Sequence, residues 1–150
     1  MDEIFEREFN EMLVEAFHLL LKEEMEFVKS LAGYDLSARE IHLLQGVGLN
    51  DGSATVSEVA AGLHITLAST TVLTNRLETE GYLVKRRGSS DGREVLLSLT
   101  DKGREIDRLH GKWHVSLVQR ITGGMSPFEK EVLLNGVKKL NGIFKKDLSE

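Results

Sequence analysis

Residues 55–103 decide the fold, and they read TVSEVAAGLHITLASTTVLTNRLETEGYLVKRRGSSDGREVLLSLTDKG. Two short helical patterns come first in this stretch, and a basic hairpin pattern follows them. In the first pattern, Val59, Ala60 and Leu63 recur at the spacing of one buried helix face. Residues 62–64 include a glycine and predict the break between the two helices of a helix-turn-helix pair.

The second helix of the pair is predicted to follow Thr66 as its N-cap and to end at Gly81, which adopts a left-handed conformation without strain. Leu73 and Leu77 mark its inner side. Its other side offers small polar groups that suit base edges in the major groove of DNA, and its first turn offers backbone N–H groups to phosphate. The DNA contacts predicted on this helix are Thr66, Ala68, Ser69, Thr70, Thr71 and Asn75.

Residues 82–100 predict a strand, a six-residue polar loop and a second strand, in which alternate side chains are buried. The loop is basic and predicts a wing, because arginine suits phosphate and the negative potential of a narrow minor groove. We expect Asp91 to orient Arg93. The wing residues predicted to contact DNA are Arg86, Arg87, Ser90 and Arg93. The alternative is a solvated basic hairpin on an unrelated α+β domain.

These motifs resemble the winged-helix core of the MarR family of bacterial transcription regulators. The resemblance rests on the Asp-x-Arg wing (Asp91 and Arg93) and on the Leu-Thr-x-x-Gly that closes it (Leu99, Thr100 and Gly103), and it covers essentially the whole chain. It implies a mostly helical fold with a small β-wing in one domain of residues 1–150. Residues 36–103 would form the winged helix-turn-helix, and residues 1–35 and 104–150 the dimerisation helices.

A closer resemblance concerns residues 108–131, RLHGKWHVSLVQRITGGMSPFEKE. They are most similar to regulators of bacterial fatty-acid synthesis genes, which respond to acylated carrier protein. The resemblance implies acylated carrier protein or a fatty acyl ligand as a partner. An apolar crevice lined by Phe17, Leu20, Leu21 and Trp113 is the predicted place for the acyl chain.

The composition is that of a small globular protein. The chain has 150 residues and no cysteine, which excludes disulfides, thiol redox sensing and cysteine metal ligands. No apolar run is long enough to cross a bilayer, so we expect a soluble cytoplasmic protein without a membrane partner. The net charge is −5, but residues 1–52 carry 12 acidic and 4 basic residues whereas residues 53–112 carry 8 and 9. This asymmetry is expected when only one face meets phosphate.

Long helices are predicted on both sides of the winged region. The second helix of the chain has a Ser37-x-x-Glu40 capping box, Thr100 caps the helix after the wing, and Ser126, Pro127 and Glu129 begin the last one. One short domain does not easily bury the outer sides of these helices, so we expect a homodimer rather than an internally packed monomer. The residues predicted to pair are Phe5, Phe9, Leu133, Val137, Leu140 and Phe144.

Four side chains stand out as candidate metal ligands. His110 and His114 lie four residues apart on one helix, Glu24 is a charge on an apolar stripe, and His42 lies near the inner side of the second helix. Three imidazoles and a carboxylate suit one zinc or another divalent transition metal per subunit. The same set resembles the sensing site of the zinc-responsive branch of the MarR family. A second site in that branch uses a cysteine, which this chain lacks, so the metal is either sensory or structural.

The sequence thus predicts a homodimeric DNA-binding transcription regulator, expected to be a repressor, that binds a pseudo-palindromic operator and responds to a metal ion or an acyl group. It predicts no enzyme, because residue 111 after His110 is glycine and not the glutamate of His-Glu-x-x-His hydrolases. The alternatives are a metal-binding helical hydrolase and an interaction module that does not bind DNA. Neither His18 nor His64 is assigned a role.

Overall fold

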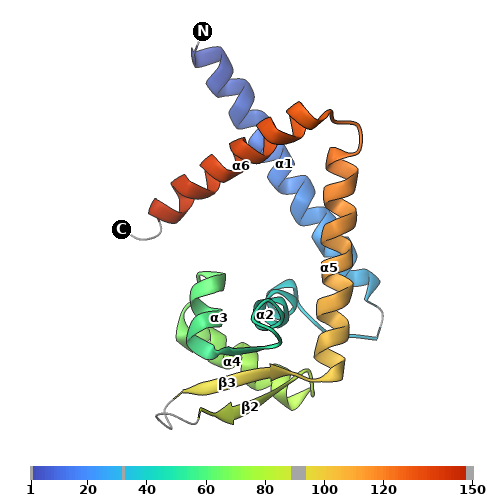
Figure 1. Cartoon of the computed structure of the whole chain (residues 1–150), viewed down its shortest axis with the longest axis vertical. Helices are drawn as coiled ribbons and strands as arrows, with labels where there is room; N and C mark the ends of the chain where they lie inside the picture. The colour runs from blue at the N-terminus through green and yellow to red at the C-terminus, as the bar shows by residue number, and fades with distance from the viewer. Residues whose placement is uncertain (1, 32, 89–93, 148–150) are drawn as a thin grey trace. The chain divides into compact units, whose positions relative to one another are not determined.

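The computed structural model describes residues 2–31, 33–88 and 94–147. The chain divides into two compact units, Met1–Gly111 and Lys112–Glu150, and the helix α5 contributes to both. The elements, in chain order, are α1 (Asp2–Ser30), α2 (Ala38–Gly48), β1 (Ser53–Thr55), α3 (Val56–Leu63), α4 (Leu67–Thr79), β2 (Leu83–Arg87), β3 (Val95–Leu99), α5 (Asp101–Thr122) and α6 (Pro127–Asp147) (Figure 1). The expected mostly helical fold with a small β-wing is confirmed, and the single domain of residues 1–150 stays a prediction.

The helices begin where the sequence places their caps. Ser37 and Glu40 form a complete capping box at α2, and Ser126 and Glu129 exchange the same bonds at α6. The Thr66 side chain accepts from Ser69 N–H at the start of α4, and Thr100 Oγ1 accepts from Gly103 N–H at the start of α5. These bonds satisfy backbone donors that would otherwise have no partner within the helix.

The break between α3 and α4 differs in detail from the expectation. The helix α3 continues through Gly62 and Leu63, and His64 is the residue that adopts the left-handed conformation, with φ of 53°. The reason is local, because the helical hydrogen bonds of α3 continue to its last residue. The chain then needs only one residue with positive φ to leave the helix and change direction. The outcome is still a helix-turn-helix pair.

The sheet contains one strand more than the sequence predicts. Its three antiparallel strands follow the order β1-β3-β2, so that β3 lies in the middle. In the register, Leu97 of β3 lies opposite Ala54 of β1 and Lys85 of β2. The strand β1 has only three residues, which is too short for an alternating pattern to be recognised in the sequence.

The hydrophobic core of the first unit lies between α2, α4, the sheet and the first turns of α5. Gly103 brings α5 close to the hairpin, because a Cβ atom at this position would lie 2.0 Å from the Tyr82 carbonyl oxygen. The side chains that are almost completely buried in this core are Ile41, Leu43, Leu44, Val47, Leu77, Tyr82, Leu83, Leu97 and Ile106.

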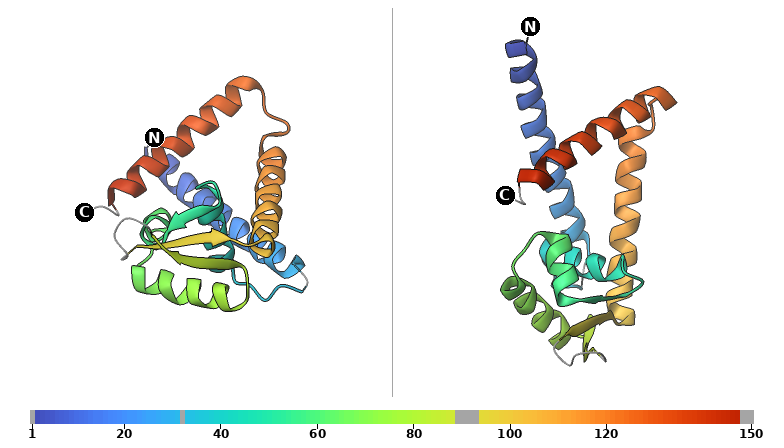
Figure 2. Two further views of the ribbon diagram at one scale, coloured as in Figure 1. Left: turned by 60° about the horizontal axis from the view of Figure 1, so that its bottom comes forward. Right: turned by 60° about the vertical axis from the view of Figure 1, so that its left-hand side comes forward.

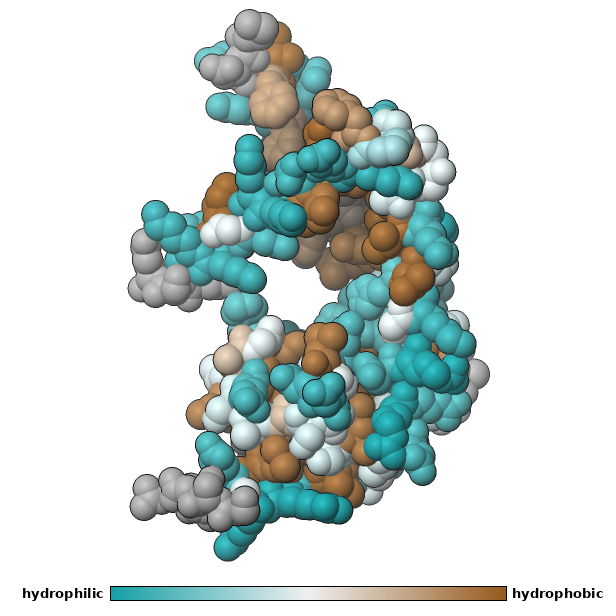
Figure 3. Space-filling view, in the orientation of Figure 1, coloured by the Kyte–Doolittle hydropathy of each residue, from teal (hydrophilic) through white to brown (hydrophobic). Residues whose placement is uncertain are grey.

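The second unit is built differently. None of the described residues of α6 is buried, and Leu133, Val137 and Phe144 leave 37%, 45% and 54% of their surface exposed. Apolar atoms are visible at the surface of the last two helices in Figure 3. Side chains of α5 and α6 in this unit also line a groove of about 320 Å³, formed by Val118, Ile121, Thr122, Lys130, Leu133, Leu134 and Val137.

Candidate nucleic-acid interface and metal centre

The outward face of α4 carries most of the DNA contacts predicted on this helix. Thr66, Ala68, Ser69, Thr71 and Asn75 are all exposed. Their exposure follows from the helix period, since the opposite face packs into the core. Figure 2 shows α4 beside the hairpin of β2 and β3, and both belong to the first unit.

Thr70 is an exception, and its predicted contact with DNA is wrong. Its side chain is fully buried, and its hydroxyl donates to the Thr66 carbonyl at 3.0 Å. The physical reason is its position, because Thr70, Thr74 and Leu77 form one buried row at the four and three spacing of a helix face. The N–H groups of Ser69 and Thr70 are not free either, since both donate to Thr66.

Basic side chains continue the exposed face onto the hairpin. Arg86 and Arg87 are exposed on β2. Ser90, Asp91 and Arg93, which complete the predicted wing, lie outside the described residues, and their roles stay predictions. Lys85 differs from its neighbours, because its ammonium group donates to Asn75 Oδ1 and lies 3.6 Å from Glu78 Oε2.

Arg76 links α4 to α2 and to the residues just before α2. Its guanidinium lies 3.2 Å from Glu40 Oε1 on α2 and 3.0 Å from Asp35 Oδ2 before α2, and Nε donates to Glu80 Oε1 at 3.0 Å. The hydrogen bond to Glu80 and the charge of Glu40 raise the pKa of Arg76. Glu40 is 1% exposed and also accepts from Ser37. The same carboxylate therefore completes the capping box of α2 and holds Arg76 of α4.

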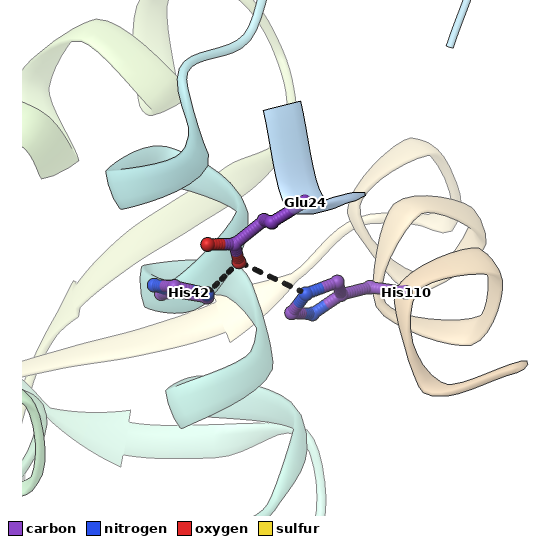
Figure 4. A group of neighbouring side chains, drawn as sticks. All are labelled: Glu24, His42 and His110. Atoms are coloured by element: carbon purple, nitrogen blue, oxygen red, sulfur yellow. Dashed lines mark hydrogen bonds and ion pairs between the residues drawn. The ribbon is translucent and has the colours of Figure 1, made fainter. Parts of the chain in front are cut away.

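Three of the four predicted metal ligands come together in the first unit. Glu24 Oε1 of α1 lies 2.5 Å from His42 Nε2 of α2 and 3.8 Å from His110 Nε2 of α5 (Figure 4). One possible ligand atom from each residue lies within 4.8 Å of the other two. A carboxylate and two imidazoles at such distances form a donor set that suits a transition metal ion.

The surroundings of this group are partly apolar. His110 is fully buried, and its ring centroid lies 5.6 Å from that of Phe27, one turn after Glu24 on α1. The Glu24 and His42 side chains keep 15% and 37% of their surface exposed. Three helices of the first unit therefore meet at one partly accessible polar group.

His114 follows His110 by four residues along α5 but belongs to the second unit. There its ring lies edge-on against that of Trp113, with 4.7 Å between centroids. Its role as the fourth ligand stays a prediction. The apolar crevice between Phe17, Leu20, Leu21 and Trp113 stays a prediction for the same reason, because its residues belong to both units.

Sequence reasoning missed the partners of Arg76 and Lys85. The spacing of Arg76 and Glu80 is a sequence signal for an ion pair on one helix. The contacts with Asp35 and Glu40 have no such signal, since they join residues 41 and 36 positions apart. The predicted dimerisation residues Phe5, Phe9, Leu133, Val137 and Phe144 are exposed, and Leu140 is half-buried.

No single helix in the described part of the chain is long and apolar enough to cross a membrane. The pair α3 and α4 reaches the necessary length and composition only together, and it is bent by 114°.

Comparison with known proteins gives matches that agree with one another. Residues 26–108 match the family described as "Transcriptional regulator SarA/Rot". FabT of Streptococcus pneumoniae, solved as a crystal structure in complex with DNA, is 35% identical with a TM-score of 0.82, over 93% of this chain and 97% of the other. A MarR protein from Peptoclostridium difficile is 20% identical with a TM-score of 0.78, over 91% and 89% of the two chains, which shows a common fold.

Relatives of Bacillus subtilis give shorter matches. The uncharacterized HTH-type transcriptional regulator YfiV is 32% identical over 108 residues, which are 71% of this chain and 66% of that protein. The uncharacterized HTH-type transcriptional regulator YkoM is 30% identical over 59% of this chain and 57% of its own length. The chain thus spans just under two thirds of the first relative and less of the second.

Proposed function

Because the chain belongs to the MarR family of winged-helix transcription regulators, we propose that it is a homodimeric repressor that binds a pseudo-palindromic operator. The observation that carries the proposal is the exposed polar face of α4 beside the exposed Arg86 and Arg87 of β2. Short polar side chains suit base edges in the major groove, and arginines suit the phosphates on either side. FabT, the relative with 35% identity, was crystallised with DNA.

The first experiment measures binding to labelled DNA from upstream of the protein's own gene by fluorescence anisotropy at several salt concentrations. We expect Arg87→Ala to lower the affinity and to reduce the slope of log K against log salt by about 1, because one phosphate contact is lost. Arg108→Ala, which removes an exposed arginine from α5, is the matched control and should leave both unchanged. Equal effects of the two substitutions would contradict the proposed face.

We propose that Glu24, His42 and His110 hold one divalent transition metal ion such as zinc. The distances within the group and the chemistry of its donors support this. The metal supplies a positive charge that would join α1, α2 and α5, and it is regulatory or structural rather than hydrolytic. An ion bound more tightly in one arrangement of these helices would bias the protein toward that arrangement.

Calorimetric titration with zinc tests the metal proposal. We expect one ion per subunit, and we expect His42→Ala to weaken binding strongly while His64→Ala, which removes an exposed histidine from the turn after α3, has no effect. Affinity should also fall as the pH is lowered, because protons compete for imidazole ligands. Equal affinity of wild type and His42→Ala would contradict the proposed site.

A fatty acyl group on a carrier protein is the second candidate effector. The observation in its favour is the exposed apolar surface of α1, to which Phe17, Leu20 and Leu21 contribute. Titration of acylated carrier protein into the DNA complex, with the unacylated form as control, tests it. An unchanged affinity for DNA would contradict an acyl effector and leave the metal as the proposed one.

A further inference from the structure

The junction of α4 and β2 contains a lysine that is held in place from two sides. Lys85 Nζ donates to Asn75 Oδ1 and lies 3.6 Å from Glu78 Oε2. The other oxygen of Glu78 accepts from the Lys85 backbone N–H at 3.1 Å. The Lys85 side chain is 17% exposed. Lys85 is therefore fixed by α4, with its charge balanced by Glu78, and is less available to phosphate than the exposed Arg86 and Arg87.

This contact determines which end of the Asn75 amide is occupied. An ammonium group has three donors and no acceptor, so the amide atom beside it must be the carbonyl oxygen. Lys85 takes one of the two lone pairs of Oδ1 and sets a positive charge beside the other, so the group of Asn75 best placed for another partner is its Nδ2 amino group, which only donates. Asn75 is exposed on the same face of α4 as Ala68 and Thr71.

An amide whose oxygen already accepts from an ammonium group favours a different base from a free amide. A free asparagine pairs with adenine through two bonds, because it accepts from the N6 amino group and donates to N7. When Lys85 donates to Oδ1, an adenine N6 amino group would have to share that oxygen with an ammonium group and to approach its positive charge, which disfavours adenine. Guanine has acceptors at both O6 and N7 in the major groove, so it remains a good partner for Nδ2.

We propose that Lys85 is a specificity-determining residue that makes Asn75 favour guanine over adenine at one base pair of each half-site. The inference rests on the proposed binding of DNA by the outward face of α4. It assigns Lys85 to base selection through Asn75 and not to a phosphate contact, although its sequence position among the basic residues of the hairpin suggests the latter.

The test compares the binding of operator variants in which every base pair is changed in turn. For the wild type we expect one position at which guanine binds at least about 5-fold more tightly than adenine, the lower end of the range for a specific base contact. Asn75→Ala should remove the preference at that position. Lys85→Met keeps the apolar stem of the lysine, and it should reduce the preference below about 2-fold or shift it to adenine.

Arg86→Met is the matched control, because it removes one positive charge from the neighbouring residue of β2. It should weaken binding to all operator variants equally and leave the base preference unchanged. Circular dichroism and thermal unfolding of each variant separate misfolding from altered recognition. If Lys85→Met unfolds, Lys85→Leu is used in its place, since it also has no donor for Asn75 Oδ1 and should likewise lose the preference for guanine.

Two results would overturn the inference by itself. One is a Lys85→Met variant that binds all operator variants more weakly but keeps the wild-type preference, which would make Lys85 a phosphate contact. The other is an Asn75→Ala variant with an unchanged preference. Failure of the wild type to bind any DNA would instead overturn the proposed function and this inference together.

Discussion

The part of the first unit from α2 to the first turns of α5 buries most of its apolar side chains, whereas α6 of the second unit leaves them at its surface, as α1 of the first unit also does. Leu43, Leu44 and Leu97 in the first unit are completely buried, while Leu133 and Val137 of α6 are 37% and 45% exposed. Both units carry apolar residues at regular spacing, so the spacing alone does not separate them. The difference teaches that periodicity identifies the apolar side of a helix but not what covers it.

Exposed apolar surface on this scale indicates a contact with another molecule, because monomeric soluble proteins seldom leave large apolar patches in water. In the proposed dimer, a second copy of the chain covers α6. The predictions below test this difference between the two units, beginning with the largest expected effect.

The double substitution Leu133→Glu and Val137→Glu should convert the proposed dimer to a monomer. Two carboxylates at the proposed contact would lose their hydration on pairing. Affinity for a two-half-site operator should then fall by about 100-fold or more, because the second half-site no longer adds to binding. Size-exclusion chromatography with light scattering and anisotropy measure the two effects. Lys138→Glu is the control, and a double variant that remains dimeric would contradict the role of α6.

Leu44→Ala should destabilise the first unit by about 2–5 kcal/mol, since it removes buried methyl groups and leaves a cavity. Leu49→Ala is the matched control, because Leu49 adjoins the same helix but is 79% exposed. We expect its free energy of unfolding to change by less than about 0.5 kcal/mol. Urea unfolding followed by circular dichroism measures both. Similar losses in the two variants would mean that burial in the first unit has been misassigned.

Arg76→Met should destabilise the first unit less than Leu44→Ala does. It deprives the buried Glu40 Oε1 of its contact with the guanidinium, and an unsatisfied buried polar group costs about 1–3 kcal/mol. The variant should also weaken DNA binding, because α4 loses its links to Asp35 and Glu40. Arg108→Met is the control in both the urea and the anisotropy measurements. Unaltered stability of Arg76→Met would show that the contact between Arg76 and Glu40 Oε1 does not stabilise the folded state.

The smallest effects concern the capping boxes, which occur at the start of helices in both units. Thr55→Ala at α3 and Ser126→Ala at α6 each remove one side of a capping box, and each should cost about 1 kcal/mol. Thermal unfolding measures the cost. Equal losses would show that helix starts are stabilised locally in both units, whatever covers the helix afterwards, and a loss confined to Thr55→Ala would contradict this.

The same caps respond to pH in a definite direction. Hydrogen bonds from Thr55 and Ser126 hold the pKa of Glu58 and of Glu129 below the ordinary value of 4.5. A carboxyl group whose pKa is lowered by folding stabilises the folded state above its unfolded pKa, and this contribution disappears as the pH falls through the lowered pKa. Glu58→Gln and Glu129→Gln should therefore flatten the loss of thermal stability below about pH 4.5.

Sequence patterns predicted the local features of this protein. The caps at Ser37, Thr66 and Ser126 and the hairpin of β2 and β3 depend on residues within a few positions of one another, and all are present. Thr70 shows where the local reasoning failed. Its place in the first turn suggested a backbone N–H free for phosphate, whereas its spacing to Thr74 and Leu77 already placed it on the buried row.

Contacts between distant parts of the chain had weaker signals in the sequence. Glu24, His42 and His110 were recognised as a group because each is a polar residue near an apolar helix face and because the set resembles the sensing site of the zinc-responsive branch of the MarR family. The links from Arg76 to Asp35 and Glu40 were not, since exposed and buried arginines have the same local pattern. Such pairings depend on how helices pack, which no short window of sequence contains.

Gly103 tolerates substitution far less than other glycines of this protein do. A mutational library at this position should return only glycine, because any side chain would collide with the Tyr82 carbonyl. Gly111, Gly136 and Gly142 also lie in the last two helices, yet the described structure leaves open space within 4 Å of a Cβ at each. Alanine is favoured over glycine within helices. These three positions are therefore the natural starting points for a more heat-resistant variant, whereas residue 103 offers evolution and engineering no alternative.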